Sequence, residues 1–584
     1  MEYLPFELKP DNGECGRPCG ENLEACPTYQ KLQDNLKEQC REHIYLLQYL
    51  HRLPDEISMP EYHAKLVKGK TGSNGRNLIY EAGGGIFIHI LDNLNDVRDY
   101  YIPIEPSIIE PVDEKLDFIE ERLADYVDDL EGITDDKKRI EIILGITDKL
   151  VVINNNGNSS QSKPAGKKDR NNGNGRKSKD KLSLTQTQYK SLRYLLTRKL
   201  EGMGVLEPLI RDTNIEDISC SGLGKIYVEH KVFAGLTTSI GFSEHQELDR
   251  FVIQLAERIK HPVTFRQPIV DATLPDGSRV NIVYGIDVSK QGSNFTIRRF
   301  SKVPISVIEL IQFGAMNYEM AAYLSMIIQE RMNVWVSGET ASGKTTLINA
   351  LTTFVPPEDK IVSIEDTPEI QVPHPNWIRG VTRESGKDGD SSAVSMFDML
   401  KAALRQRPNL IIVGEIRGAE GAIAFQAMQT GHACMSTFHA ATVTKLIQRV
   451  TGNPINVPKT YVDNLNVIVI CSMVRLPNGK PGRRVLSINE IVSYDSASDS
   501  FSFMEVFAWN PLDDTFDFKG HMNSYLLEEK IASRRGITRD KIKKIYAEVK
   551  KRGEILKRIH EQEITNFYEV HGVLTKASRE GLFK

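Results

Sequence analysis

From about residue 304 onward, short apolar runs alternate with segments that have helical apolar spacing. This alternation is typical of a parallel sheet whose strands are connected by helices. The expected strands are Val334–Val336, Ile361–Ile364, Leu410–Val413, Ala433–Thr437 and Val467–Val474. The turn Pro477-Asn478-Gly479 then predicts a hairpin that returns along Arg484–Ile491, and the charged tail Asn523–Ile564 is predicted to be helical. We therefore expect an α/β domain followed by a helical C-terminal region.

Residues 182–300 combine the helical and the strand period. Helical spacing predicts helices over Leu182–Leu209 and Glu244–Lys260, whereas Ile215–Val232 alternates as strands and turns. A turn at Pro275-Asp276-Gly277-Ser278 separates further strand-like runs, which continue to Phe295–Phe300. This part is predicted to be a separate α+β domain.

The first 153 residues are expected to form a mainly helical region that contains cysteines. The pattern predicts a helix around Tyr29–Leu53, a strand at Ile86–Ile90 and an acidic helix over Asp113–Leu130.

Residues 154–181 separate this region from the rest of the chain. They hold one aliphatic residue, Ala165, together with eight basic and two acidic side chains, so they bury too little surface to offset the entropy of ordering. We expect a flexible basic linker whose charge keeps it solvated; contact with acidic lipid headgroups or a partner is the alternative. The predicted division is 1–153, 154–181, 182–300, 301–505 and 506–584.

Composition supports a globular protein of several domains. The chain has 584 residues, 40% hydrophobic and 26% charged, and a formal net charge of −4. No global basic excess calls for nucleic acid, and no apolar run reaches the roughly 18 residues that a spanning helix needs. The start of the sequence shows no signal-peptide pattern. We expect a cytoplasmic protein, or a peripheral one on the inner face of the cell membrane.

Four of the seven cysteines lie in the first 40 residues: Cys15, Cys19, Cys26 and Cys40. Such a cluster in a reducing compartment favours ligation over disulfides, so it is a candidate site for Zn²⁺ or an iron–sulfur cluster. The spacing matches no standard pattern, and unligated thiols are the alternative. Cys220, Cys434 and Cys471 stand in apolar contexts and are interpreted as buried side chains.

The strongest chemical signal follows the strand Val334–Val336. The phosphate-binding pattern G-x-x-x-x-G-K-[ST] is matched at every fixed position, and a helix is expected to follow. Such a loop presents backbone N–H groups to phosphate oxygens, with the lysine reaching the β- and γ-phosphates and the threonine hydroxyl on Mg²⁺. The expected cofactors are therefore ATP and Mg²⁺, bound by Gly338, Glu339, Thr340, Ala341, Ser342, Gly343, Lys344, Thr345 and Thr346.

Three further boxes follow the phosphate loop. The apolar strand that ends at Glu415 has the Walker B arrangement, in which a carboxylate lies near Mg²⁺ and the attacking water. The strand Ile361–Ile364 runs into three carboxylates, of which Glu369 is the last. His439 ends a run that begins at Thr430-Gly431-His432.

These four boxes, in this order, resemble the type II/type IV secretion superfamily of traffic ATPases over roughly Leu182–Ser493, and the His-box ending looks like its archaeal branch. The resemblance implies a RecA-like P-loop core with a parallel-rich sheet. It implies Glu369 as the general base or water-positioning residue, Glu415 as support for Mg²⁺ through water, and His439 as a γ-phosphate sensor. Members work as homo-hexamers with a polytopic membrane platform protein and filament subunit machinery.

The resemblance also implies cationic groups that reach the phosphates. Arg279, Arg298 and Arg299 of the α+β domain and Arg383 of the P-loop domain are the candidates, because cations stabilise charge on the transferring phosphoryl oxygens. Bacterial type II relatives carry a CxxC…CxxC zinc insert that is missing after Val474, so that branch is disfavoured.

We therefore predict an ATP-hydrolysing hexameric motor that powers assembly of an archaellum or type IV pilus, or protein secretion, with no specific nucleic acid. Two alternatives stay open. A RecA-type nucleic-acid translocase would need a basic, aromatic-lined pore. A metal- or redox-sensing regulator would use the N-terminal cysteines and hold ATP as a ligand only.

Overall fold

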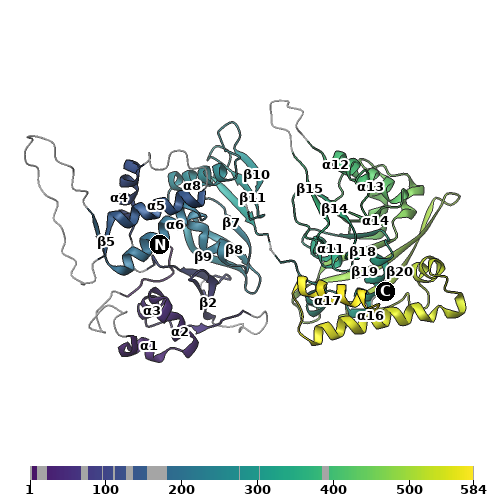
Figure 1. The fold of residues 1–584 in the computed structure, drawn as a ribbon, viewed down its shortest axis with the longest axis horizontal. Coiled ribbons are helices and arrows are strands. Elements are labelled where there is room, and N and C mark those ends of the chain that lie inside the picture. Colours follow the sequence, from purple (N-terminus) through teal and green to yellow (C-terminus); the bar gives the residue numbers. More distant parts are fainter. Residues whose placement is uncertain are drawn as a thin grey trace, which may run out of the picture. The chain divides into compact units, whose positions relative to one another are not determined.

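The computed structural model describes residues 3–9, 23–66, 76–94, 96–108, 112–126, 136–153, 181–274, 276–300, 303–383 and 394–582. The chain divides into two compact units, Met1–Phe300 and Ser301–Lys584 (Figure 1). The linker predicted at 154–181 lies outside the described residues, apart from its last residue.

The N-terminal unit is organised by a ten-stranded sheet with the order β1-β2-β3-β4-β9-β8-β7-β12-β11-β10. The pairs β1–β2 and β4–β9 are parallel and the others antiparallel. The strands are β1 (Glu61–Tyr62), β2 (Asn77–Gly83), β3 (Ile86–Leu91), β4 (Tyr100–Ile104), β7 (Ile215–Cys220), β8 (Gly224–His230), β9 (Ala234–Phe242), β10 (Ile269–Thr273), β11 (Arg279–Val283) and β12 (Asn294–Arg298). A separate parallel pair joins β5 (Val151–Ile153) to β6 (Leu182–Leu184).

Strands from both sides of the predicted linker therefore share one sheet, which sequence periodicity did not reveal. The leucine-rich stretch predicted as one helix is broken: α6 begins after the capping box of Thr185 and Gln188 and ends at Leu200, before Gly204 with φ +57°. The helical elements are η1 (Leu23–Ala25), α1 (Pro27–Lys31), α2 (Asp34–Glu42), α3 (Ile44–His51), α4 (Asp113–Leu123), α5 (Asp136–Leu150), α6 (Gln186–Leu200), η3 (Gly204–Leu206), α7 (Glu207–Arg211) and α8 (His245–Arg258).

The C-terminal unit is built on a nine-stranded sheet with the order β15-β14-β16-β17-β13-β18-β19-β20-β21. The first six strands in this order, β15-β14-β16-β17-β13-β18, form parallel pairs. The last three, β19, β20 and β21, are added by antiparallel pairing. They are β13 (Val334–Gly338), β14 (Ile361–Glu365), β15 (Trp377–Val381), β16 (Leu410–Glu415), β17 (Ala433–Phe438), β18 (Val467–Arg475), β19 (Pro481–Asp495), β20 (Ser500–Asn510) and β21 (Thr515–Asp517). The five strands predicted from apolar runs are confirmed, whereas β15, β20 and β21 were not predicted.

Helices cover both faces of this sheet. They are α9 (Val307–Gln312), α10 (Tyr318–Gln329), α11 (Lys344–Thr352), α12 (Met396–Leu404), α13 (Glu420–Gln429), α14 (Val443–Thr451), η4 (Lys459–Asn464), η5 (Leu526–Ile531), α15 (Ala532–Arg534), η6 (Arg539–Lys541), α16 (Lys543–Glu561) and α17 (Phe567–Arg579). The fold is mixed α/β with a parallel-rich sheet, as the sequence predicts. Among the described residues, every helix is too short or too polar to cross a membrane.

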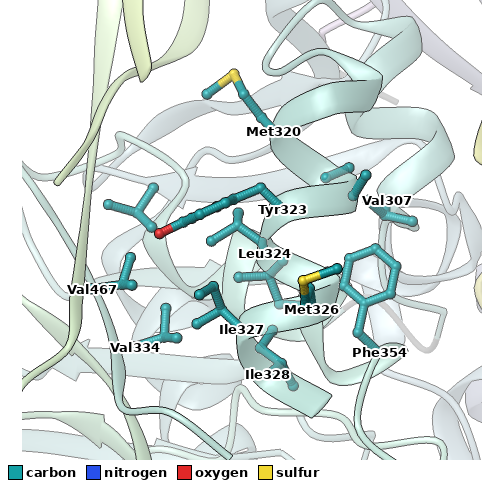
Figure 2. Packing of buried hydrophobic residues seen from close by; sticks show 14 of the residues in the cluster. Val307, Met320, Tyr323, Leu324, Met326, Ile327, Ile328, Val334, Phe354 and Val467 are labelled. Atoms are coloured by element: carbon teal, nitrogen blue, oxygen red, sulfur yellow. The ribbon is translucent and has the colours of Figure 1, made fainter. Parts of the chain in front are cut away.

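Successive residues of the central strands enter two different cores, which is why these strands read as continuous apolar runs. In β13, Val334 and Val336 pack with α9, α10 and α11, while Trp335 packs with α12, α13 and α14. Figure 2 shows the first core, where the α10 side chains Leu324 and Ile327 lie close to Val334 and Val467. The observed pairing of β13, β14, β16 and β17 sets where these strands end relative to one another.

The C-terminal helices belong to the same core as α10. Glu490 of β19 is fully buried, and its carboxylate accepts hydrogen bonds from the Tyr323 hydroxyl at 2.6 Å, the Ser524 hydroxyl at 2.6 Å and the Leu526 amide at 3.1 Å. Burial raises the pKa of Glu490, and these hydrogen bonds oppose the rise. The tail is thus fastened to the sheet, and the domain boundary that we expected at 505 falls inside β20.

We expect Tyr323→Phe to destabilise the C-terminal unit by about 1.5–3 kcal/mol, because it takes one hydrogen bond from a buried carboxylate. The measurement is the free energy of unfolding from urea titration. Tyr461→Phe, at an exposed tyrosine, is the control and should stay within about 0.5 kcal/mol of the wild type. Equal stabilities for both variants would show that the Glu490 contact does not hold the tail.

Candidate active site

Four neighbouring parallel strands end at one edge of the C-terminal sheet. In spatial order these are β14, β16, β17 and β13, which end at Glu365, Glu415, Phe438 and Gly338. In open α/β sheets, ligands bind beyond the carboxyl ends of the strands. The topology therefore brings the phosphate loop and the three later boxes to the same edge.

The phosphate loop connects β13 to α11 through a sharp change of backbone direction. Gly338 leaves no room for a side chain, since an added β-carbon would lie 2.2 Å from the Cys471 carbonyl oxygen. Gly343 has φ +91°, in the left-handed region that favours glycine, and precedes the first turn of α11. The nine-residue helix that follows places its unpaired N–H groups and positive dipole end at the loop, as a phosphate requires.

Lys344 lies across the loop rather than pointing into solvent. Its Nζ donates to the carbonyl oxygens of Gly338 at 3.1 Å and Glu339 at 2.9 Å. Burial lowers the pKa of Lys344, and the carboxylates of Glu415 and Glu369 oppose this shift. Thr345 and Thr346 are half-buried in the first turn of α11, where a hydroxyl can ligate Mg²⁺.

Glu415 ends β16 with a partly exposed carboxylate that is held by a neighbour. The Nε of Arg417 donates to its Oε2 at 3.0 Å, and a second guanidinium nitrogen donates to the same oxygen. The carbonyl of Gly414 accepts the Thr437 hydroxyl at 2.6 Å, which ties β16 to β17 at the site edge. The donor set of Thr345 and Glu415 suits a magnesium–nucleotide complex, because Mg²⁺ takes few protein oxygens and keeps phosphate and water ligands.

The carboxylates of the acidic box differ in their exposure to solvent. Glu365 is buried, and its Oε1 accepts the amides of Glu369 at 2.8 Å and Ile370 at 2.7 Å. The Glu369 side chain is exposed, and the Glu369 carbonyl accepts the Asn349 amide of α11 at 3.1 Å. Glu365 thus shapes the turn that carries Glu369, and α11 links that turn to the phosphate loop. Burial raises the pKa of Glu365 from 4.5 to about 7.

His439 follows β17 beside the phosphate loop. The Ser337 hydroxyl of β13 donates to the Ala440 carbonyl at 2.6 Å and accepts the Ala440 amide at 3.2 Å, which fixes the turn after His439. A cavity of about 240 Å³ opens here, lined by Glu339, His439, Ala440, Ala441, Lys445, Gln448 and Arg449. A residue of the phosphate loop and the histidine thus line one cavity.

The arginine candidates occupy different environments. Within the N-terminal unit, Arg279 pairs with Asp271 at 2.6 Å, and Arg298 is exposed at the end of β12. Arg299 donates to the Leu209 carbonyl at 2.7 Å, and burial lowers its pKa, so this guanidinium serves the packing of α7. Arg383 follows β15, with its backbone bridged to Val394.

The cysteine cluster gains no support. Cys15 and Cys19 lie outside the described residues, while Cys26 and Cys40 are buried. Burial raises the pKa of the Cys40 thiol to about 12. In the part of the chain that the structure describes, no group of three or more His, Cys, Asp and Glu side chains could hold a metal ion.

Sequence reasoning did not single out Glu365, Asn349, Arg417 or Ser337. Glu365 stood in a named box, and its place at the end of a fully apolar strand was the one signal of its burial. Asn349 and Ser337 act through hydrogen bonds to residues distant in sequence, which no local pattern marks, whereas Arg417 binds Glu415 two residues away.

A glycine-bearing loop between a buried parallel strand and a helix, with acidic side chains at the neighbouring strand ends, defines the class of P-loop nucleotide-binding proteins. The family model described as "Type II/IV secretion system protein" matches residues 199–484. The chain belongs to this family of secretion traffic ATPases.

Relatives match either most of the chain or about half of it or less. The uncharacterized protein MJ0900 of Methanocaldococcus jannaschii is 41% identical over 548 residues, which is 94% of this chain and 97% of that protein. The probable conjugal transfer protein TrbB of Sinorhizobium fredii is 31% identical over 53% of this chain and 94% of its own length. The type IV secretion system protein VirB11 of Bartonella henselae is 29% identical over 37% of this chain and 68% of its own length.

The raised pKa of Glu365 predicts a pH dependence of stability. The folded chain keeps this proton up to about pH 7, whereas the unfolded chain loses it near pH 4.5, so the stabilisation is complete below pH 4.5 and is lost as the pH rises towards 7. We expect the free energy of unfolding of the wild type, relative to Glu365→Gln, to fall by about 3 kcal/mol across this window.

Urea unfolding at pH 4.5, 5.5, 6.5 and 7.5 measures this difference. Glu554→Gln, at an exposed residue of α16, should follow the wild type at every pH. A Glu365→Gln profile parallel to that of the wild type would contradict the assignment.

Proposed function

We propose that this protein is an ATP-hydrolysing hexameric motor that powers assembly of a type IV filament, an archaellum or pilus, or protein secretion through a membrane platform. One observation carries the proposal. The strands that end at Gly338, Glu365, Glu415 and Phe438 are neighbours in the sheet, so the phosphate loop, Glu415 and the segments that carry Glu369 and His439 follow from one sheet edge. Membership in the secretion ATPase family supports the same function.

Lys344 and the loop backbone bind the nucleotide in this proposal. Lys344 leaves the carbonyls of Gly338 and Glu339 and donates to β- and γ-phosphate oxygens, while loop N–H groups take the remaining oxygens. Thr345 and Glu415 would hold Mg²⁺, the hydroxyl of Thr345 as a ligand and the carboxylate of Glu415 through water. When bound, Mg²⁺ neutralises charge on the phosphates.

Glu369 orients the attacking water and accepts its proton. An exposed carboxylate on a turn held by Glu365 and Asn349 can face a water in line with the γ-phosphate. His439 senses the γ-phosphate, because it shares a cavity with Glu339 of the loop. Arg298, Arg279 and Arg383 are the cations proposed to reach the phosphates. Arg299 ranks below these three as a candidate, because its guanidinium already donates to the Leu209 carbonyl.

Nucleotide-dependent movement of the N-terminal unit would convert hydrolysis into work on a polytopic membrane partner. The relatives named for type IV secretion and conjugal transfer support a partner of this kind. We accordingly propose that the protein is cytoplasmic and peripheral on the inner face of the membrane. Assembly of filament subunits and secretion of other proteins use the same motor chemistry.

We expect Glu369→Gln to lower kcat for ATP by about 10²–10⁴-fold with KM nearly unchanged, because a proton acceptor is lost and nucleotide contacts remain. Lys344→Ala should abolish binding and turnover together. Magnesium-dependent phosphate release and fluorescent-ADP titration separate the two effects. Asp513→Asn, on the turn after β20, is the matched acidic control. Full turnover by Glu369→Gln would refute its role.

The proposed hexamer predicts a change of mass with nucleotide. In the presence of Mg²⁺ and a non-hydrolysable ATP analogue, sedimentation should show a species near six times 65.9 kDa. Lys344→Ala should not respond to the analogue. A wild-type chain that stays monomeric at all nucleotide concentrations would contradict a ring motor.

A further inference from the structure

The phosphate loop contains a strained residue that is not glycine. Ala341 has φ +62°, in the left-handed region that residues with a β-carbon enter only at a cost. Such a conformation persists where the surroundings hold it. The contacts around Ala341 therefore decide whether the empty loop keeps the conformation that binds phosphate.

Three side chains hydrogen-bond to carbonyls of the loop. Lys344 donates to Gly338 and Glu339, and Ser342 donates to Glu339 at 2.8 Å. The third is Arg483, whose Nε donates to the Ala341 carbonyl at 2.9 Å. The stem of Arg483 also lies over the loop, since a β-carbon added at Gly343 would be 3.5 Å from its Cδ.

Arg483 reaches the loop because its strand is fixed on the opposite side. The next residue, Arg484, is buried and makes two bonds of 2.7 Å to the Asp514 carboxylate and one of 3.0 Å to the Phe313 carbonyl. Successive residues of a strand point to opposite faces, so locking Arg484 into the core directs Arg483 to the other side. The β18–β19 register, with Met473 opposite Arg483, sets its position along the loop.

Of these four hydrogen bonds, the two made by Lys344 cannot last through the reaction. Lys344 must give up both carbonyls in order to bind phosphate, whereas Arg483 has no part in phosphate binding in this proposal and can keep its hydrogen bond to the Ala341 carbonyl. We propose that Arg483 is a positioning residue of the nucleotide site. It keeps the phosphate loop in its phosphate-binding conformation in both the empty and the occupied state. This inference rests on the proposed ATPase function. It adds to the site a supporting contact, from Arg483 of β19 to the Ala341 carbonyl, which lies outside the four sequence boxes.

The proposal predicts a change in KM rather than in kcat. Arg483→Gln should raise KM for ATP and the Kd of fluorescent ADP by about tenfold, since it loses a hydrogen bond from a charged donor, while kcat stays within about threefold. Arg483→Lys keeps one charged donor and should fall between Gln and wild type. Amide hydrogen exchange of residues 338–343 without nucleotide should be faster in Arg483→Gln.

Lys480→Gln is the control, because Lys480 is an exposed cation on the same hairpin. It should match the wild type in KM, kcat and exchange. Melting temperatures check folding, and Arg483→Lys carries the test where Arg483→Gln is unstable. Unchanged KM and exchange in the Arg483 variants would overturn the proposal, as would a loss of kcat at constant KM. A wild-type protein that does not hydrolyse ATP would refute the ATPase function. The hydrogen-exchange comparison would still test whether Arg483 holds the phosphate loop.

Discussion

The bend between β13 and α11 is the constraint on which the rest of this structure depends. A strand buried on both faces must leave the sheet at Gly338, where the Cys471 backbone leaves no room for a β-carbon. The chain then turns through the left-handed residues Ala341 and Gly343 and starts a helix. This path gathers N–H groups at one point and makes the loop a site for phosphate. Everything else at the sheet edge is arranged around it.

The contacts that hold the loop and the neighbouring turns come from several parts of the C-terminal unit. Ser337 fastens the turn after β17, Glu365 and Asn349 hold the turn that carries Glu369, and Arg483 reaches in from the β18–β19 hairpin. The hairpin is held in turn by buried polar contacts of Arg484 and Glu490. Buried polar groups need their partners, so these contacts fix one arrangement of strands. The C-terminal helices are therefore part of the structure that supports the site.

Sequence patterns predicted the elements whose signal is local. The central strands were predicted because burial on both faces makes them uniformly apolar. The phosphate loop was predicted because its pattern of glycines and lysine is specific to one loop conformation. The edge strand β15 and the hairpin strand β20 were not predicted, because partial exposure mixes polar and apolar residues along them. The leucine spacing of 182–209 continued past the glycines that end α6. Glu365 and Arg483 depend on burial and on cross-strand register, which a single sequence does not display, and the catalytic roles of Glu369, Glu415 and His439 stay predictions.

A structure of the protein with Mg²⁺ and ADP tests the central claim most directly. The account predicts that the phosphates lie against the backbone of Gly338–Thr345, with Lys344 Nζ moved from the Gly338 and Glu339 carbonyls to phosphate oxygens and Arg483 still on Ala341. Nucleotide bound elsewhere, or a loop in which Lys344 keeps both carbonyls at saturating ADP, would contradict it.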